Sequence, residues 1–182
     1  MTPKASVFIA TSLDGYIARP DGNIDWLNEA NDLVPEGEDC GYAAFMATID
    51  ALVMGRNTFD KVLSFGMWPY GDTPVYVLSS RPLDKPAHVP DTVDHLSGSP
   101  AALMQQFASK GLNHLYIDGG ATVQQFLRAG LLDEIILTLI PVVLGSGISL
   151  FGELPADVHL ECLDVKQFDF GFVQLKYAVR KL

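Results

Sequence analysis

Short apolar runs bounded by turn residues recur along this chain, and over its first two thirds they alternate with segments whose apolar positions have helical spacing. The runs at residues 6–11, 50–54, 75–78 and 114–117 are short and aliphatic or β-branched, which predicts buried strands. A weaker strand is expected at residues 91–96. Helical spacing is seen at residues 41–49, 56–65, 100–110 and 121–129. Strands that alternate with helices predict an α/β fold with a mainly parallel central sheet.

Turn and cap residues mark several of these boundaries. Asp39 stands where an N-cap of the helix at residues 41–49 would lie, and Gly130 closes the helix at residues 121–129 in the manner of a C′ glycine. The stretch at residues 31–39 is polar, contains Pro35 and Gly37, and is expected to be a loop.

The last third of the chain has a different pattern. Residues 133–143, 158–168 and 172–181 resemble strands without long helices between them, and the last two are joined by a turn at residues 169–171. This arrangement predicts an antiparallel hairpin at the C-terminal end of the sheet. The chain shows no internal repeat or linker, so its 182 residues, 1–182, are expected to form one domain.

Composition narrows the function classes. Hydrophobic residues make up 48% of the chain and charged residues 19%, which is typical of a globular protein. Acidic residues outnumber basic ones by 22 to 12, and the net charge of −10 argues against a nucleic acid partner. No apolar run approaches the roughly 20 residues that span a bilayer. The N-terminus lacks the features of a signal peptide, so a cytoplasmic protein is expected.

Residues that would hold a metal or act as a nucleophile do not form a recognisable group. The four histidines are scattered, and the two cysteines have no CxxC spacing. We therefore expect no metal site, and no arrangement of the Ser-His-Asp or Cys-His type is suggested.

Three strand ends share small or hydrogen-bond-donating residues. They are Gly55-Arg56-Asn57-Thr58, Leu78-Ser79-Ser80-Arg81 and Gly119-Gly120-Ala121-Thr122. Ligands of open α/β sheets bind at the carboxyl ends of strands, and the first turn of a helix offers free N–H groups to anions. Arginine and serine can complete a phosphate site. Each signal is weak alone, but together they predict a dinucleotide lying across three strand ends.

The ordered set of motifs resembles the dihydrofolate reductase superfamily. The residues are 12–17, 54–58, 78–81, 118–120 and 144–151, and the likeness spans about residues 5–180. It is strongest to the C-terminal reductase domain of bifunctional riboflavin-biosynthesis proteins and to their stand-alone bacterial relatives. The resemblance implies a three-layer α/β/α fold and NADPH as the cofactor.

The resemblance also implies roles for individual residues. Arg56 and Thr58 would lie at the phosphates, and Arg56 with Ser80 near the adenosine 2′-phosphate. Ser79 and Arg81 would line the adenosine end, while Gly119, Gly120, Ala121 and Thr122 would hold the pyrophosphate. Ala10 and Ile17 would flank the nicotinamide, and residues 13–23 would form a mobile loop over it.

The catalytic carboxylate is less well defined. Asp39 lies at about the family's distance before the strand end at residues 54–56, but it could equally be a plain N-cap. Asp25 and Asp14 are rival carboxylates, and Asp25 precedes Trp26, which could stack on a flat ring or fill the core. Dihydrofolate reductases carry a Pro-Trp step where this chain has Asp25-Trp26, and that departure argues against folate.

The resemblance therefore implies an NADPH-dependent reductase of a pyrimidine- or pterin-like heterocycle, such as a 5-amino-6-(5-phosphoribosylamino)uracil reductase of riboflavin biosynthesis. A ribose phosphate would need basic groups, for which Lys61 and Arg19 are the nearby candidates. A true dihydrofolate reductase, a reductase of another substrate and a non-catalytic NADP-binding module are alternatives. The long apolar C-terminal strands favour a homodimer, and a monomer is the alternative if these strands are wholly internal.

Overall fold

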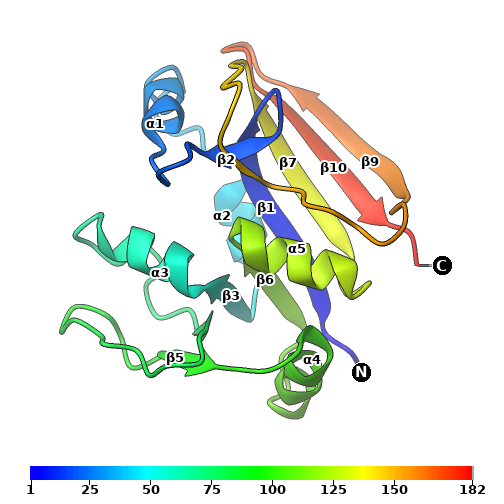
Figure 1. Ribbon diagram of the computed structural model, residues 1–182. Coiled ribbons are helices and arrows are strands. Elements are labelled where there is room, and N and C mark those ends of the chain that lie inside the picture. Colours follow the sequence, from blue (N-terminus) through cyan, green and yellow to red (C-terminus); the bar gives the residue numbers. More distant parts are fainter. Residues whose placement is uncertain (182) are drawn as a thin grey trace.

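A computed structural model describes residues 1–181 as a twisted sheet of eight strands with helices packed on both faces (Figure 1). The strands lie in the order β5 (Val93–Leu96), β4 (Val75–Leu78), β3 (Ala51–Gly55), β6 (His114–Asp118), β1 (Lys4–Ser12), β7 (Glu134–Ile140), β10 (Val173–Val179) and β9 (Leu160–Gln167). The strands from β5 to β7 pair in parallel, whereas β10 pairs antiparallel with both β7 and β9. The predicted parallel sheet and C-terminal hairpin are thus confirmed.

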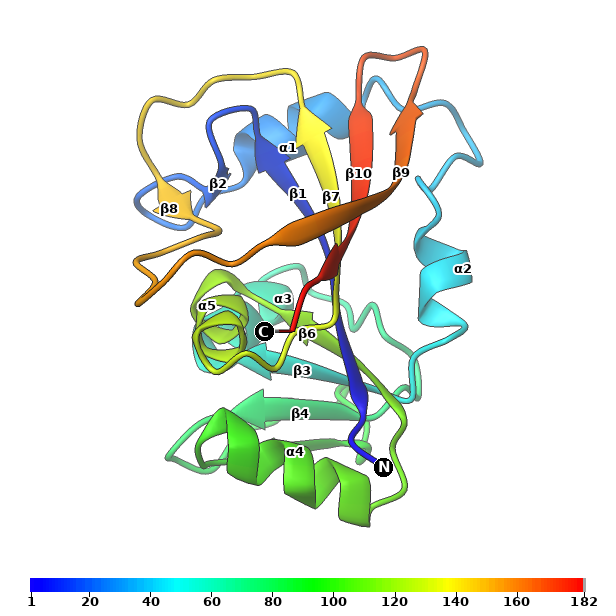
Figure 2. The ribbon, with the colours of Figure 1, turned by 90° about the vertical axis from the view of Figure 1, so that its right-hand side faces the viewer.

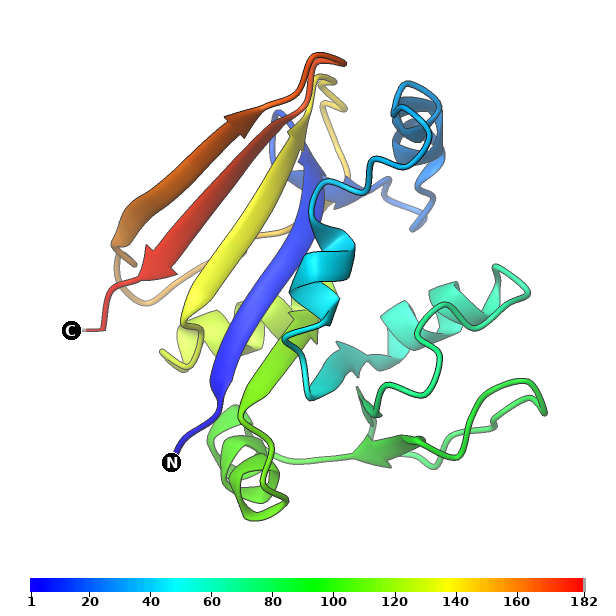
Figure 3. The same ribbon diagram turned by 180° about the vertical axis from the view of Figure 1, so that it is seen from behind.

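The five helices within residues 1–181 form the two outer layers. One face of the sheet carries α1 (Asp25–Asn31), α2 (Tyr42–Met46) and α3 (Arg56–Leu63), seen from behind in Figure 3. The other face carries α4 (Pro100–Ser109) and α5 (Gly120–Arg128), which lie in front of the sheet in Figure 2. The expected α/β/α layering is therefore confirmed.

The alternation of side chains along β3 shows why both faces must be covered. Ala51 and Val53 are fully buried against α4 and α5, while Leu52 and Met54 are fully buried on the face that packs against α2 and α3. Successive residues of a strand point to opposite faces, so a run without polar residues requires helices on both sides.

Three elements were not predicted. Strands β2 (Tyr16–Ala18) and β8 (Ile148–Ser149) pair with each other in a small second sheet beside the carboxyl end of β1. Helix α1 was also missed, because its seven residues bury only Trp26 and Ala30 and begin without a side-chain cap. Such short elements depend on tertiary packing rather than on local sequence preference.

Other boundaries differ from the predictions by a few residues. Helix α2 is five residues long rather than nine, and the Thr48 hydroxyl donates to the Phe45 carbonyl oxygen just beyond its end. Strand β7 stops before Pro141, which has no N–H to continue a ladder. No helix within residues 1–181 is long and apolar enough to cross a membrane.

Candidate functional site

The three segments predicted to hold a dinucleotide lie side by side. Strands β4, β3 and β6 are neighbours and run parallel, so their carboxyl ends meet at one edge of the sheet. Strand β1 follows β6, and the end of β1 brings Ala10 to the same edge. The fold therefore places the three predicted dinucleotide-binding segments and the predicted nicotinamide position on one continuous border of the sheet.

Two helices begin at this edge without a capping side chain. Helix α3 starts after Gly55 and helix α5 after Gly119, and neither has a capping side chain or an acidic residue in its first turn. Helix α4, by contrast, is capped by the Ser99 hydroxyl, which accepts the Ala102 N–H at 3.3 Å. Free N–H groups and the positive end of the helix dipole make such starts suitable for anions. Asn57 and Ala121 are exposed in these first turns.

Glycines allow the segments to approach closely. Gly119 has a φ of +86°, and a Cβ atom there would collide with the Thr58 hydroxyl. A Cβ on Gly120 would lie 2.8 Å from Cδ1 of Ile17, and one on Gly55 would lie 3.1 Å from the hydroxyl of Thr122. The segments around the start of α5 can therefore pack this closely only because these residues are glycine.

Arg56 connects two of the predicted segments. Its Nε donates to Asp60 at 3.0 Å, and one terminal nitrogen donates to the Pro82 carbonyl oxygen at 3.4 Å. This second contact brings the guanidinium beside the segment after β4, which includes the exposed Ser80 and Arg81. The Ser79 hydroxyl donates to the Arg81 carbonyl oxygen and fixes that turn, while Leu78 packs into the core.

A cavity of about 620 Å³ lies next to the end of β1, on the face covered by α1 and α2. Its apolar walls come from β1, β7, α1 and the turn before β10, and its polar side comes from the loop before α2. The lining residues are Phe8, Ala10, Leu27, Asn31, Val34, Pro35, Glu38, Asp39, Cys40, Tyr42, Thr138, Ile140 and Phe172. A flat ring could lie here against Ala10, and therefore beside the predicted nicotinamide position.

The two predicted catalytic carboxylates are held in their charged forms. Asp39 lines the cavity, but its two oxygens accept the N–H groups of Gly41 and Ala43, each at 2.8 Å. These hydrogen bonds lower the pKa of the Asp39 carboxyl. The N-cap residue of α2 is Gly41 rather than Asp39, although the Asp39 side chain accepts the Ala43 N–H in the first turn. Asp25 is not part of the cavity wall: it pairs with Arg19, which lowers the pKa of the Asp25 carboxyl. Their catalytic roles stay predictions.

Asp118 is a carboxylate that sequence reasoning passed over. It ends β6 on the same face as the buried Tyr116, and its side chain accepts the Gly119 N–H at 2.8 Å. Desolvation by the surrounding protein raises the pKa of Asp118 to about 6. Its charge in turn helps to raise the pKa of Tyr42, a cavity residue, to about 12, although desolvation of Tyr42 is the larger cause. The signal in the sequence was an acid directly after a buried strand.

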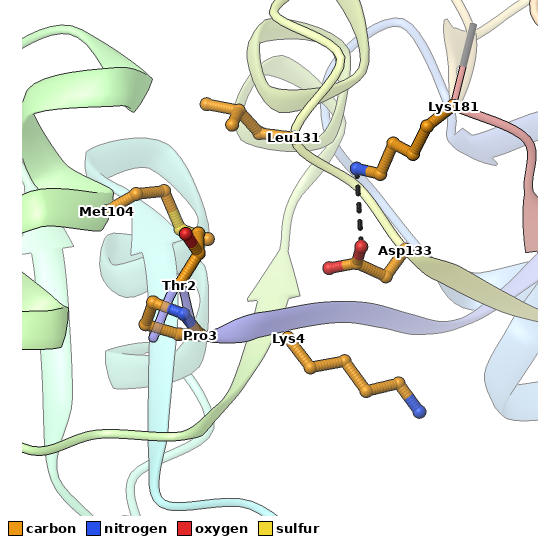
Figure 4. A pocket seen from close by; sticks show the side chains of 7 residues that line it. All are labelled: Thr2, Pro3, Lys4, Met104, Leu131, Asp133 and Lys181. Carbon is orange, nitrogen blue, oxygen red and sulfur yellow. Dashed lines mark ion pairs between the residues drawn. The ribbon is translucent and has the colours of Figure 1, made fainter.

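Another cavity, of about 460 Å³, lies at the opposite end of β1 (Figure 4). It is bordered by the start of the chain, Met104, Leu131 and the ion pair between Lys181 and Asp133, whose closest atoms are 3.3 Å apart. It lies at the amino end of the strand and takes no part in the arrangement described above.

The fold is that of the dihydrofolate reductases. Dihydrofolate reductase from Enterococcus faecalis, solved with NADP(H), superimposes with a TM-score of 0.63 over 98% of this chain and 97% of its own length, at 17% identity. Residues 3–174 match the family of RibD C-terminal domains, and the chain belongs to that family.

The similarity to other proteins extends over the whole chain. A crystal structure from Shewanella sp. PV-4, whose name refers to riboflavin biosynthesis, has a TM-score of 0.90 and 41% identity, with complete coverage of both chains. The uncharacterized protein YwjB of Bacillus subtilis (strain 168) is 39% identical and covers 98% of this chain and 99% of its own. The resemblance inferred from the motifs is thus confirmed.

Proposed function

We propose that this protein is an NADPH-dependent reductase that delivers a hydride to a small planar heterocycle of the pyrimidine or pterin type. The observation that carries the proposal is the pair of helix starts after Gly55 and Gly119, on neighbouring strand ends, which have no capping side chain and no acidic residue in the first turn. Membership of the RibD C-terminal family supports a reaction of the riboflavin-biosynthesis type.

Each segment at this edge of the sheet would bind a different part of the cofactor. Arg56 and Ser80 would hold the adenosine 2′-phosphate, since Arg56 reaches the turn that contains Ser80. The first-turn amides of α5, at Gly120, Ala121 and Thr122, would hold the pyrophosphate. Ala10 and Ile17 would flank the nicotinamide. When bound, NADPH supplies the hydride, and the protein supplies orientation and exclusion of water.

We assign proton donation to Asp118 rather than to Asp39 or Asp25. An acid works best when its pKa lies near the operating pH, and the pKa of Asp118 is raised to about 6 by burial. The pKa values of Asp39 and Asp25 are both lowered by hydrogen bonds to their charged forms. Tyr42 lines the cavity wall, and the Asp118 charge contributes to its raised pKa, although desolvation of Tyr42 contributes more.

We propose that the protein is a homodimer in which a second copy covers an apolar part of the sheet. Ile9, Leu137, Leu175 and Val165 form a cross-strand row from β1 to the edge strand β9. Figure 2 shows no helix over the β10 and β9 part of this face, and Val165 is 57% exposed. An apolar row of this kind on an edge strand favours pairing with a second copy of the chain.

Two measurements test the proposal. Titration with NADPH and with NADH, followed by thermal unfolding, should give tighter binding of NADPH and a higher melting temperature. Absorbance of the reduced nicotinamide should then fall when a ribosylamino-pyrimidine or a dihydropterin is added. Binding without turnover of any such ring would favour a non-catalytic NADP-binding module, and preferred turnover of dihydrofolate would favour a true dihydrofolate reductase. Failure of NADPH to bind would overturn the proposal.

A further inference from the structure

We propose that the heterocycle reduced by this protein carries no phosphate or other anionic group, so that its substrate is an uncharged or cationic ring. This inference rests on the proposed function and concerns the cavity beside Ala10. It is based on the wall of this cavity, where two carboxylates lie together. No lysine or arginine within residues 1–181 is part of that wall.

The two carboxylates lie together on the polar side of the cavity. Glu38 is half-buried, and one of its oxygens accepts the Cys40 N–H at 2.7 Å, which fixes the side chain at the wall. Asp39 follows in the same loop. Its carboxylate accepts two backbone N–H groups, which lower its pKa and favour the ionised form. Both groups are acceptors, so they would attract the N–H groups or a positive charge of a ring.

The lysines near the cavity lie outside its wall. Lys4 and Lys176 both pair with Glu134, at 3.1 Å and 3.4 Å, in an adjoining cavity of about 430 Å³ that shares Phe8 and Cys40 with the first. The ammonium of Lys166 lies 4.3 Å above the ring of Phe168. None of these three lysines is part of the wall beside Ala10.

The two basic residues that the sequence offered for a ribose phosphate are also unsuitable. Arg19 is paired with Asp25, and Lys61 lies in the last turn of α3. Neither side chain reaches the cavity wall. A phosphate in this cavity would face two carboxylates without a counter-charge, and such like-charge contacts disfavour binding.

The test compares two pairs of ligands that share a ring and of which one member also carries an anionic group. The first pair is dihydrobiopterin and dihydrofolate, and the second is a ribosylamino-pyrimidine and its phosphate ester. Dissociation constants are measured by calorimetry on the full chain, with and without NADP⁺. We expect the uncharged member of at least one pair to bind about tenfold or more tightly than its anionic counterpart. Tighter binding of both anionic members, equal binding within both pairs, or no binding of either uncharged member would overturn the inference.

A charge reversal at the wall gives a second readout. In Glu38→Lys the preference should shift toward the anionic member of the pair by about tenfold or more, with a smaller shift in Glu38→Gln. The matched control is Glu36→Lys, because Glu36 is exposed in the same loop and is not part of the cavity wall. An unchanged preference in Glu38→Lys, in a protein that melts as a folded domain, would contradict the inference.

The two proposals fail in different ways. Ring binding without NADP⁺ reports only on the cavity, so loss of NADPH binding would overturn the reductase while leaving the charge preference measurable. Conversely, if the protein bound NADPH and reduced the phosphate ester in preference, the proposed function would stand and the inference about charge would be wrong.

Discussion

The carboxylate of Asp14 accepts the backbone N–H of Gly145 at 2.7 Å, across 131 residues of sequence. Its other oxygen accepts the Leu144 N–H at 3.1 Å and the Ser12 hydroxyl at 2.6 Å. The pairing of β2 with β8 continues this connection. The segment at residues 13–23, expected to close over the nicotinamide, is therefore joined to the segment after β7, and we expect the two to act together as one cover.

Replacing Asp14 should loosen this cover. Asp14→Ala removes an acceptor for two backbone N–H groups and one hydroxyl, so the cover would have to be ordered when cofactor binds. We expect NADPH to bind about three- to tenfold more weakly, because ordering a segment opposes binding. Fluorescence titration of NADPH measures the change. Asp21→Ala is the matched control, since Asp21 lies in the same segment and accepts only the Asn23 N–H. Equal effects of the two variants would contradict the joined cover.

Regular elements could be predicted from the sequence because their patterns are local. Strand β3 shows this, since its continuous apolar run is explained by helices on both faces. The pairing of β2 with β8 could not be predicted, because its two strands are three and two residues long and far apart in the chain. Their stability comes from contacts such as that of Asp14 with Gly145.

Arg56 is predicted to select NADPH over NADH. Arg56→Ala removes the guanidinium beside the turn of Ser80 and Arg81. Because this group would make a charge-assisted hydrogen bond to the 2′-phosphate, NADPH should bind at least about tenfold more weakly. The affinity for NADH, which lacks that phosphate, should change little. Both affinities are measured by calorimetry. Arg128→Ala, at the far end of α5, is the control. Equal losses of affinity for the two cofactors would show that Arg56 does not bind the 2′-phosphate.

Gly119 and Gly130 make a second matched pair. Both have positive φ, +86° and +66°, at opposite ends of α5, but only a Cβ on Gly119 would meet another side chain, that of Thr58. Gly130→Ala should cost roughly 1 kcal/mol from backbone strain. Gly119→Ala should cost at least about 1 kcal/mol more, since the added methyl group overpacks the site, and it should abolish tight NADPH binding. Denaturant unfolding and titration measure both effects. Matching losses in the two variants would argue against a close approach at Gly119.

The uncovered sheet face predicts the oligomeric state. Val165→Lys places a charge in the row formed with Leu175 and Leu137, so the proposed dimer should dissociate more than about tenfold more readily. Asp164→Lys introduces the same residue on the other side of β9 and should leave the dimer intact. Light scattering after size exclusion gives the mass of each variant. A native protein that is monomeric at all concentrations would exclude this interface.

The site was less predictable from the sequence than the fold. The glycines after β3 and β6 could be identified because a strand followed by a helix makes a recognisable local pattern. The carboxylates could not be ranked, because the sequence does not show that Asp39 accepts two amides or that Asp118 is desolvated. Their pKa values are set by three-dimensional surroundings.

Asp118 should make stability and turnover depend on pH. Its pKa is raised from 3.8 to about 6, so the folded state binds the proton more tightly than the unfolded state does. The resulting stabilisation is present at low pH and is lost as pH rises from about 4 through about 6. Asp118→Asn does not titrate, and its amide oxygen can still accept the Gly119 N–H. Relative to the native protein, the variant should therefore gain stability over this range, by up to about 3 kcal/mol, because one pKa unit corresponds to about 1.4 kcal/mol.

The variant should be more stable than the native protein but less active. The native rate should fall as pH rises through about 6, because the acid form is consumed, whereas Asp118→Asn should be slow at every pH and lack this step. Denaturant unfolding and steady-state rates over the same buffers give both profiles, with Asp91→Asn as an exposed control. If the stability difference between native protein and variant were flat with pH, the raised pKa would be wrong. If only the rates were unaffected, Asp118 would be a buried acid without a role in proton donation.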